Sequence, residues 1–384
     1  MGLKNVRLRK LWLKVHLYIG LLAGAVLVLI GLTGSVLVFD HAIDELLNPA
    51  LLTVEGEGGY RSFDEIIAAA RAGHPDSPGP SLLVFPRVQN GVFLAFFEEA
   101  SGGEYGRQEV AVDPYTAEIL GERQWGGYLM SAIYKLHSNL LLETPGEVTV
   151  GILGLLLLVS VGTGIYLWWP LFWPPRRRKI GQAFTIRRGA RPVRFYFDLH
   201  KTSGIYSAVI IVVIAFSGIY LVFPEYIKPL VDVFSPLTGF PEVKSTPLPG
   251  MAPISVEQAV TIADRLFRDA ELKGIAPPED PEGVYIVVKR QPGEVRQAWG
   301  ESRVWIDAYS GEILAVRNPK QFSAGDTFLN WLFPLHSGEA LGLPSRILVF
   351  ISGFVPLILY VTGLKLWFKR RRSKKISRER RKFQ

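Results

Sequence analysis

The sequence contains no cysteine among its 384 residues. A chain without cysteine has no disulfide, no thiolate nucleophile, no Cys-ligated iron–sulfur cluster and no C-x-x-C-H site for covalent haem. Imidazole is then the main side chain left to bind a metal. The sequence also lacks the motifs G-x-x-x-x-G-K-[ST], H-E-x-x-H and G-x-S-x-G. ATPases, zinc proteases and serine hydrolases of the usual kinds are therefore excluded.

Charge is missing from four long apolar segments, and each is close to the roughly 20 residues that a helix needs to cross a bilayer. These segments are residues 17–39, 148–169, 202–223 and 347–364. The first has no small-residue cleavage site after it, so we interpret it as a retained anchor rather than a signal peptide. The sequence predicts a membrane protein with four transmembrane helices.

Three segments are strongly basic, with 25 of the 43 Lys and Arg and only two acidic residues: 1–16, 176–201 and 365–384. The excess of basic residues on the cytoplasmic side of membrane proteins predicts that all three, and both termini, lie in the cytoplasm. Residues 50–145 and 225–345 are then expected in the periplasm. A basic tail directly after a membrane helix indicates binding to anionic lipid rather than to nucleic acid.

The two halves of the sequence repeat each other. His16 precedes a glycine by eighteen residues, and so does His200; His137 precedes a Thr-Gly pair by 26 residues, and so does His336. The corresponding positions are His16 with His200, Gly34 with Gly218, His137 with His336, Thr163-Gly164 with Thr362-Gly363, and segment 112–120 with 306–314. Four of the six histidines thus occupy duplicated positions.

These four histidines carry the predicted chemistry. Ionisable residues at membrane depth are costly and indicate function. Two imidazoles that face each other across a helix bundle supply both axial ligands of a haem iron, and glycines beside them leave room for the macrocycle. The glycines expected to do so are Gly20, Gly24, Gly162, Gly164 and Gly204. The alternative is that each histidine is an amphipathic residue at the membrane interface.

Two further possibilities concern the remaining polar residues. His41 and Glu225, at corresponding positions, could complete a non-haem metal site, but we prefer a solvated or headgroup-facing His41 and a surface His74. Four cations could pair with haem propionates or simply lie at the interface: Lys14, Lys135, Lys201 and Arg346.

Each predicted periplasmic stretch has the pattern of one helix beside a small antiparallel sheet. The first is expected to contain a helix over 63–71 and strands over 82–87, 92–97, 109–113 and 118–122. The second is expected to contain a helix over 256–268 and strands over 285–289, 303–307 and 312–316.

Several motifs together resemble the PepSY-associated transmembrane family over nearly the whole chain. They are W-L-K-V-H-L-Y-I-G-L-L-A-G from residue 12, L-H-S-N-L-L-L from residue 136, V-G-T-G-I-Y-L-W-W-P from residue 161, L-H-S-G from residue 335 and V-T-G-L-K-L-W from residue 361. Within that family the chain resembles the four-helix siderophore-iron reductases of the FoxB type. Family members often have H-R where this chain has His16-Leu17 and His200-Lys201, so no role is assigned to an arginine there.

The resemblance implies an α-helical membrane protein with four transmembrane helices, two small periplasmic α/β PepSY-like domains and an internal two-fold repeat. It also implies an enzyme of the bacterial inner membrane, a ferric-siderophore reductase with two haem b per chain. The haem ligands would be His16, His200, His137 and His336, with His41 as a minority candidate. The electron donor would be cytoplasmic or a quinol, and the acceptor a ferric siderophore such as a ferrioxamine-like hydroxamate.

Two other functions remain open from the sequence. The chain could be a membrane-tethered PepSY regulator without redox activity, or a cytochrome that passes electrons to another periplasmic acceptor. The expected domain boundaries are 1–47 (tail and first helix), 48–125 (first PepSY-like domain), 126–175 (interfacial segment and second helix), 176–199 (basic loop), 200–230 (third helix), 231–322 (second PepSY-like domain), 323–368 (interfacial segment and fourth helix) and 369–384 (basic tail).

Overall fold

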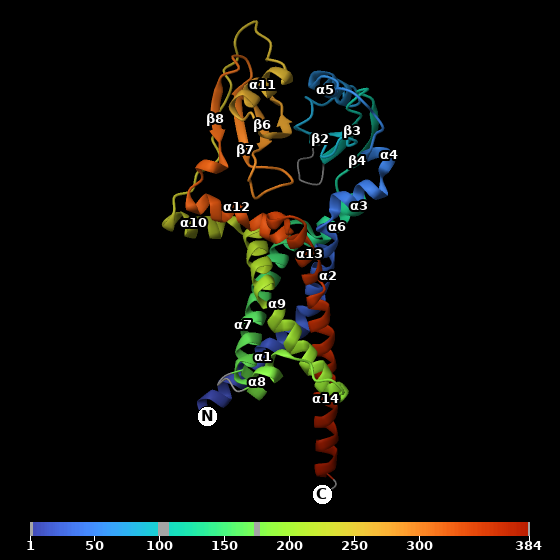
Figure 1. Ribbon diagram of the computed structural model, residues 1–384, viewed down its shortest axis with the longest axis vertical. Helices are drawn as coiled ribbons and strands as arrows, with labels where there is room; N and C mark the ends of the chain where they lie inside the picture. Colours follow the sequence, from blue (N-terminus) through green and yellow to red (C-terminus); the bar gives the residue numbers. More distant parts are fainter. Residues whose placement is uncertain (1–2, 99–106, 173–176, 383–384) are drawn as a thin grey trace. The chain divides into compact units, whose positions relative to one another are not determined.

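A computed structural model describes residues 3–98, 107–172 and 177–382 (Figure 1). The chain divides into two compact units. The helical unit consists of Met1–Val38, Ile133–Ile227 and Leu335–Gln384, and the sheet unit consists of Phe39–Ala132 and Lys228–Pro334. The predicted boundary between residues 175 and 176 lies outside the described residues.

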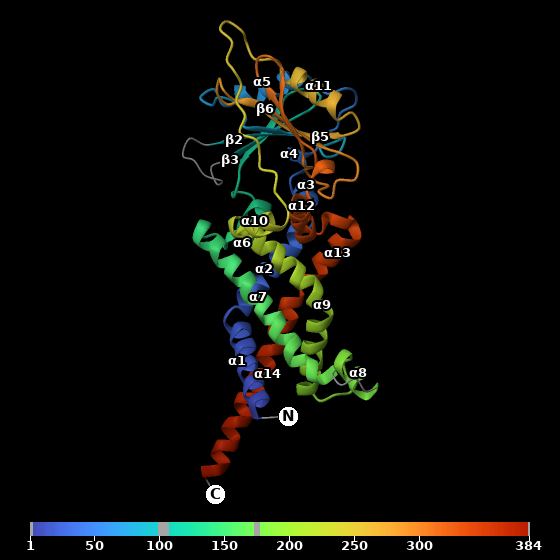
Figure 2. The same ribbon diagram turned by 90° about the vertical axis from the view of Figure 1, so that its left-hand side faces the viewer.

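The helical unit contains the long apolar helices (Figures 1 and 2). Its helices are α1 (Leu3–Leu22), α2 (Gly24–Leu37), α7 (Glu143–Phe172), α8 (Arg177–Phe184), α9 (Pro192–Val222), α13 (Leu343–Ser352) and α14 (Val355–Lys382), with a 3₁₀ turn η2 (Glu339–Leu341). Within the described residues, Glu143–Trp169, Pro192–Val222 and Leu343–Ser373 are long and apolar enough to cross a membrane, and a bent pair, Arg7–Leu22 with Gly24–Leu37, would make a fourth span. By length and composition this is a membrane protein.

The first apolar run is not the single straight helix that the sequence predicts. Helices α1 and α2 meet at Ala23 with a bend of 59°. The ring of Tyr360 lies against Gly24, where a Cβ atom would come within 2.5 Å of its Cδ2 atom. Glycine has a low helix propensity, which makes this position a favourable place for the helix to break.

Glycines bring the apolar helices into close contact. Helix α7 packs against α1 and α9, and α14 packs against α9 and α2. A Cβ atom on Gly154 would lie 2.9 Å from Ile219, and one on Gly31 would lie 2.6 Å from the carbonyl oxygen of Gly353. Small residues at such crossings allow helix backbones to approach closely, as is common in membrane proteins.

The sheet unit is built on one eight-stranded antiparallel sheet with the strand order β4-β3-β2-β1-β5-β6-β7-β8. The strands are β1 (Leu82–Val84), β2 (Phe93–Glu98), β3 (Arg107–Val112), β4 (Ile119–Gln124), β5 (Glu271–Ala276), β6 (Val284–Arg290), β7 (Ser302–Asp307) and β8 (Ile313–Arg317). All seven strands predicted from the sequence are present with small shifts at their ends. Strand β5 was not predicted.

Strand β5 joins the two predicted periplasmic domains. Leu83 of β1 pairs with Ile275 of β5, and Val84 pairs with Gly274. The sequence predicts separate domains at 48–125 and 231–322, whereas in the structure both stretches contribute to one sheet. Pairing β1 with β5 satisfies the backbone groups of two edges that would otherwise be exposed.

Helices α5 (Phe63–Ala72) and α11 (Val256–Leu266) lie together on one face of this sheet (Figure 2). They pack over a core that includes the fully buried side chains of Leu83, Phe93 and Ile306. Both helices begin with a capping box, at Ser62 and Ser255. The remaining helices are α3 (Asp40–Leu47), α4 (Pro49–Leu52), α6 (Leu129–Asn139), α10 (Pro224–Phe234) and α12 (Ala324–Ser337), with a 3₁₀ turn η1 (Pro319–Gln321).

Candidate cofactor site

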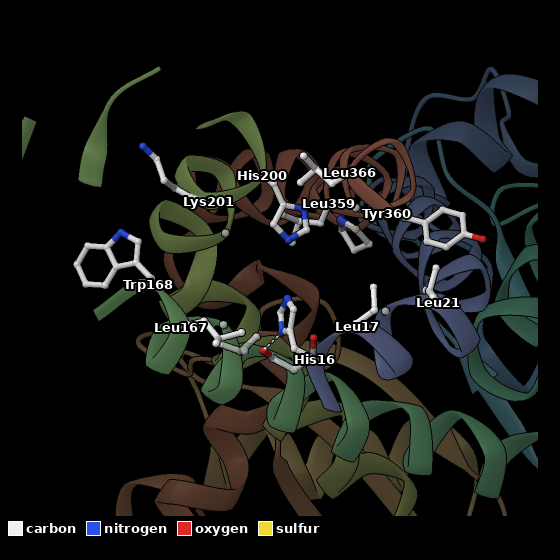
Figure 3. Close-up of a pocket in the computed structure, with 18 of the residues that line it drawn as sticks. His16, Leu17, Leu21, Leu167, Trp168, His200, Lys201, Leu359, Tyr360 and Leu366 are labelled. Carbon is white, nitrogen blue, oxygen red and sulfur yellow. Dashed lines mark hydrogen bonds between the residues drawn. The ribbon is translucent and has the colours of Figure 1, made fainter. Parts of the chain in front are cut away.

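Four predicted site residues form two histidine pairs in the helical unit. In the first histidine pair, His16 of α1 faces His200 of α9, with the ring centres 6.1 Å apart and the ring planes at 85° (Figure 3). In the second histidine pair, His137 of α6 faces His336 of α12, again with the ring centres 6.1 Å apart, and with the planes at 57°. The structure therefore brings together the histidines that the sequence places on the same side of the membrane.

Three of the four rings donate a hydrogen bond from Nδ1 to a backbone carbonyl on another helix. The Nδ1 atom of His16 lies 3.0 Å from the Ser160 carbonyl oxygen. The Nδ1 atom of His137 lies 2.9 Å from the carbonyl oxygen of Ile30, and the Nδ1 atom of His336 lies 3.0 Å from the carbonyl oxygen of Ile214. A carbonyl oxygen can only accept, so Nδ1 carries the proton and Nε2 keeps its lone pair.

A hydroxyl group also contacts each Nδ1 atom. The distances to Nδ1 are 3.0 Å for Thr163 with His16, 2.9 Å for Thr362 with His200, 3.3 Å for Thr33 with His137 and 3.2 Å for Ser217 with His336. Each of these hydroxyls donates its own proton to a carbonyl in the preceding turn of its helix. It is then an acceptor toward the imidazole, which gives all four histidines the same tautomer.

A glycine follows each of these hydroxyl residues and lies against the edge of the histidine ring. A Cβ atom would lie 2.8 Å from His137 Cε1 if added to Gly34, and 3.0 Å from His336 Cε1 if added to Gly218. The corresponding distances are 3.3 Å for Gly164 with His16 and 3.6 Å for Gly363 with His200. A side chain at Gly34 or Gly218 would push the ring away from its Nδ1 partners.

The sequence contains a signal for this pairing of a hydroxyl residue with a glycine. The Thr-Gly pairs at 163–164 and 362–363 recur at fixed offsets, and Gly34 and Gly218 are each preceded by Thr or Ser. From the sequence, the glycines near the histidines are expected to leave room for a macrocycle. In the structure Gly20, Gly24, Gly164 and Gly204 line a cavity, as does Gly363. Gly164 and Gly363 in addition lie against the rings of His16 and His200.

An apolar cavity of about 290 Å³ surrounds the first histidine pair. Figure 3 shows His16 and His200 pointing toward each other across it, with leucine side chains along its walls. Polar and aromatic groups among its lining residues include Trp168, Lys201 and Arg370.

Two of the cations considered as propionate partners are engaged by protein groups. Lys201 is buried, pairs with Asp198 at 3.0 Å, and donates to the backbone carbonyl oxygens of Gln182 and Thr185. Arg346 donates to the carbonyl oxygen of Val38, at the end of α2. These contacts fix loop and helix ends, and they give each cation a structural role.

The other two histidines belong to the sheet unit. His41 is half exposed and pairs with Asp40 at 3.2 Å. His74 differs from the predicted surface residue, because its ring packs on Phe97 with centres 4.5 Å apart and its Nε2 lies 3.4 Å from Glu122. Within residues 3–98, 107–172 and 177–382, no group of three or more His, Asp or Glu side chains is arranged to hold a bare metal ion.

Comparison with known proteins identifies the family of the chain. A search of curated proteins gives no match to this sequence. The family model described as the PepSY-associated TM region matches residues 13–370, which include both histidine pairs and the whole sheet. The chain therefore belongs to the family of the PepSY-associated TM region.

Proposed function

We propose that this protein is a di-haem b reductase of the bacterial inner membrane, which moves electrons from the cytoplasmic side to a ferric siderophore in the periplasm and releases iron as Fe(II). The observation that carries the proposal is the geometry of the two histidine pairs. An imidazole nitrogen binds a first-row metal at about 2.0 Å and lies about 1.1 Å from the centre of its ring, so two rings that share one metal have centres about 6 Å apart. Both pairs have a spacing of 6.1 Å.

The surroundings of the rings also fit haem ligation. Each Nδ1–H is held by a carbonyl or hydroxyl acceptor, which directs the Nε2 lone pair toward the partner histidine and raises its basicity. At the first pair, the apolar cavity leaves a wall without side chains at Gly20 and Gly204. Bound haem b would supply one-electron redox chemistry at each pair.

The topology that we propose has four spans, with the bent pair α1 and α2 as the first. Both termini and the basic loop 176–199 lie in the cytoplasm, because these segments contain most of the basic residues. Residues 39–132 and 228–334 then lie in the periplasm. We interpret the two halves of the sheet, β1–β4 and β5–β8, as two joined PepSY-like domains, because each has the helix-and-strand order expected for one.

The chemistry of the substrate agrees with the lack of an acid–base motif. Hard oxygen donors of a siderophore such as a hydroxamate hold Fe(II) less tightly than Fe(III), so electron transfer alone releases the metal. The reaction needs no nucleophile and no general base.

The proposal is tested on detergent-purified protein by optical spectra and a pyridine haemochrome assay, with ferrozine capture of Fe(II) from ferrioxamine. We expect two low-spin haem b per chain, and the loss of one of them in each of His16→Ala, His200→Ala, His137→Ala and His336→Ala. His41→Ala is the matched control and should keep both. A colourless wild-type protein, purified from cells with ample haem, would exclude the proposal. Two haems without Fe(II) release would indicate a cytochrome with another acceptor.

A further inference from the structure

Three arginines crowd around one carboxylate in the second half of the sheet. Arg303 on β7 and Arg317 on β8 are direct partners across the two strands. Both form ion pairs with the carboxylate of Glu301, at 3.9 Å for Arg303 and 3.8 Å for Arg317. Arg296, in the connection between β6 and β7, pairs with the same carboxylate at 2.5 Å. Like charges directly opposite each other on neighbouring strands destabilise a sheet. We call these three residues the arginine cluster.

The guanidinium groups of the arginine cluster are poorly neutralised. The side chains of Arg303 and Arg317 are only 23% and 13% exposed. Their Nε atoms are buried and have no hydrogen-bond partner among the described residues. Burial lowers the pKa of Arg303, and the neighbouring Arg296 and Arg317 lower it further, which Glu301 only partly opposes.

A second carboxylate nearby is already occupied. Glu294 accepts hydrogen bonds from the hydroxyl of Ser302 at 2.6 Å and from the backbone amides of Gln291 and Glu301 at 2.8 Å and 2.6 Å. The ion pairs of the three arginines are made with Glu301 and not with Glu294. The cluster keeps an excess of positive charge in a place where solvent screens it poorly.

Aromatic rings hold the guanidinium groups in position. Phe240 contacts both cross-strand arginines, with its ring centre 5.0 Å from Arg303 and 4.8 Å from Arg317. Phe322 lies 4.4 Å from Arg317, and Phe333 lies 4.8 Å from Arg296. Cation–π contacts of this kind orient an arginine but do not satisfy its N–H donors.

At the corresponding position in the first half of the sheet, the charge of the arginine is neutralised by acidic residues. There Glu109 and Arg123 are direct partners across β3 and β4, with an ion pair of 2.7 Å, and Asp44 contacts Arg123 at 2.8 Å. Tyr128 stacks on Arg123 at 3.6 Å. Moving 194 residues along the chain takes Glu109 to Arg303, Arg123 to Arg317 and Tyr128 to Phe322. The first half thus has an acid, Glu109, at the position where the second half has Arg303.

We propose that the arginine cluster is a binding site for an anionic group, a carboxylate or a phosphate, of a ligand that enters the sheet unit at β7 and β8. Arginine is the side chain best suited to such groups, because its planar fork of donors matches their two oxygens. The ligand would supply the negative charge that Glu109 supplies in the first half. It would supply acceptors for Arg303 and Arg317 and relieve their repulsion. The site uses none of the four paired histidines.

The test measures thermal unfolding of the full-length protein in a neutral detergent, with citrate and inorganic phosphate as probes and chloride added to keep the ionic strength constant. We expect at least one probe to raise Tm saturably, by roughly 3–8 °C. Arg303→Glu, which copies the first half of the sheet, should abolish this rise, and Arg303→Gln should weaken or abolish it without creating a new ion pair. Arg290→Gln, on the same sheet and paired with Glu271, is the control and should respond like the wild type.

Nanodiscs distinguish the two sources of such a group. A lipid headgroup would be identified as the ligand if Tm is higher in phosphatidylglycerol than in phosphatidylcholine nanodiscs and if both Arg303 variants lose this difference. Free citrate and phosphate would then have no effect. A response to the free anions would identify a soluble ligand. The proposal is wrong if the wild type responds to no probe in detergent or nanodiscs, or if Arg303→Glu and Arg303→Gln respond as strongly as the wild type.

Discussion

Asp64 and Glu257 each cap the helix of the other. The Asp64 carboxylate accepts from the backbone amide of Val256, at the start of α11, at a distance of 3.1 Å. The Glu257 carboxylate accepts from the amides of Phe63 and Asp64, at the start of α5. Both acids occupy the second position of their helix, so this exchange of caps links the two halves of the sheet unit through the helices that cover them.

Removal of one of these caps should destabilise the sheet unit. Glu257→Ala leaves the first amides of α5 without a side-chain acceptor, and loss of a helix N-cap costs about 1 kcal/mol. We expect a lower midpoint in urea unfolding followed by tryptophan fluorescence. Glu279→Ala, in an exposed loop, is the control and should unfold like the wild type. Equal stability of Glu257→Ala and the control would show that the exchanged caps contribute nothing.

The same contact predicts a pH dependence. Burial, and after it the Asp64 carboxyl, raise the pKa of Glu257 above its ordinary value of 4.5. The folded state then binds more protons than the unfolded state, so the free energy of unfolding falls as pH rises from 4.5 through the raised pKa. Glu257→Gln keeps an acceptor for Phe63 but does not titrate. Its Tm should therefore fall less than that of the wild type in this interval, as measured by thermal scans from pH 4 to 8. Parallel Tm curves would contradict the assignment.

The sequence predicted most local features of the fold but not its long-range contacts. Local capping boxes indicate the starts of α5 and α11, with Ser62 and Glu65 in the first and Ser255 and Gln258 in the second. Strand β5 was missed because Gly274 and the bulge beside it break the alternation of apolar residues, and its pairing with β1 depends on residues nearly 200 positions away. The contact of Gly24 with the ring of Tyr360, beside the bend at Ala23, joins residues that are even farther apart in the sequence.

The candidate site shows the same division. Duplicated offsets were enough to select His16, His200, His137 and His336 from six histidines. The acceptors of their Nδ1 protons were not predictable, because every residue has a backbone carbonyl group and the residue type at Ser160 does not mark its carbonyl as an acceptor. The arginine cluster could have been found by aligning the two halves, since Glu109 and Arg303 differ in the sign of their charge within an otherwise similar segment.

The hydroxyl beside His16 should tune its strength as a ligand. Thr163→Val keeps the volume of this buried side chain but removes the acceptor that lies 3.0 Å from Nδ1. Loss of such an outer-shell partner lowers metal affinity by about 10–100-fold in proteins with histidine ligands. We expect faster haem loss to apomyoglobin and a shifted midpoint potential. Thr163→Ser, which keeps the hydroxyl, should restore both. A Thr163→Val protein with unchanged haem retention and potential would show that the Ser160 carbonyl alone orients the ring.

Gly34 should be essential for the second histidine pair. In Gly34→Ala the new methyl group would lie 2.8 Å from Cε1 of His137, so the ring must move away from Ile30 and Thr33. We expect about one haem per chain in place of two in the pyridine haemochrome assay, with the first pair unaffected. Gly162→Ala is the matched control, because a Cβ atom there has nothing within 4 Å, and it should keep both haems. Size-exclusion chromatography would be used to check that both variants are folded. If a folded Gly34→Ala protein keeps both haems, contact between Gly34 and the ring does not position His137.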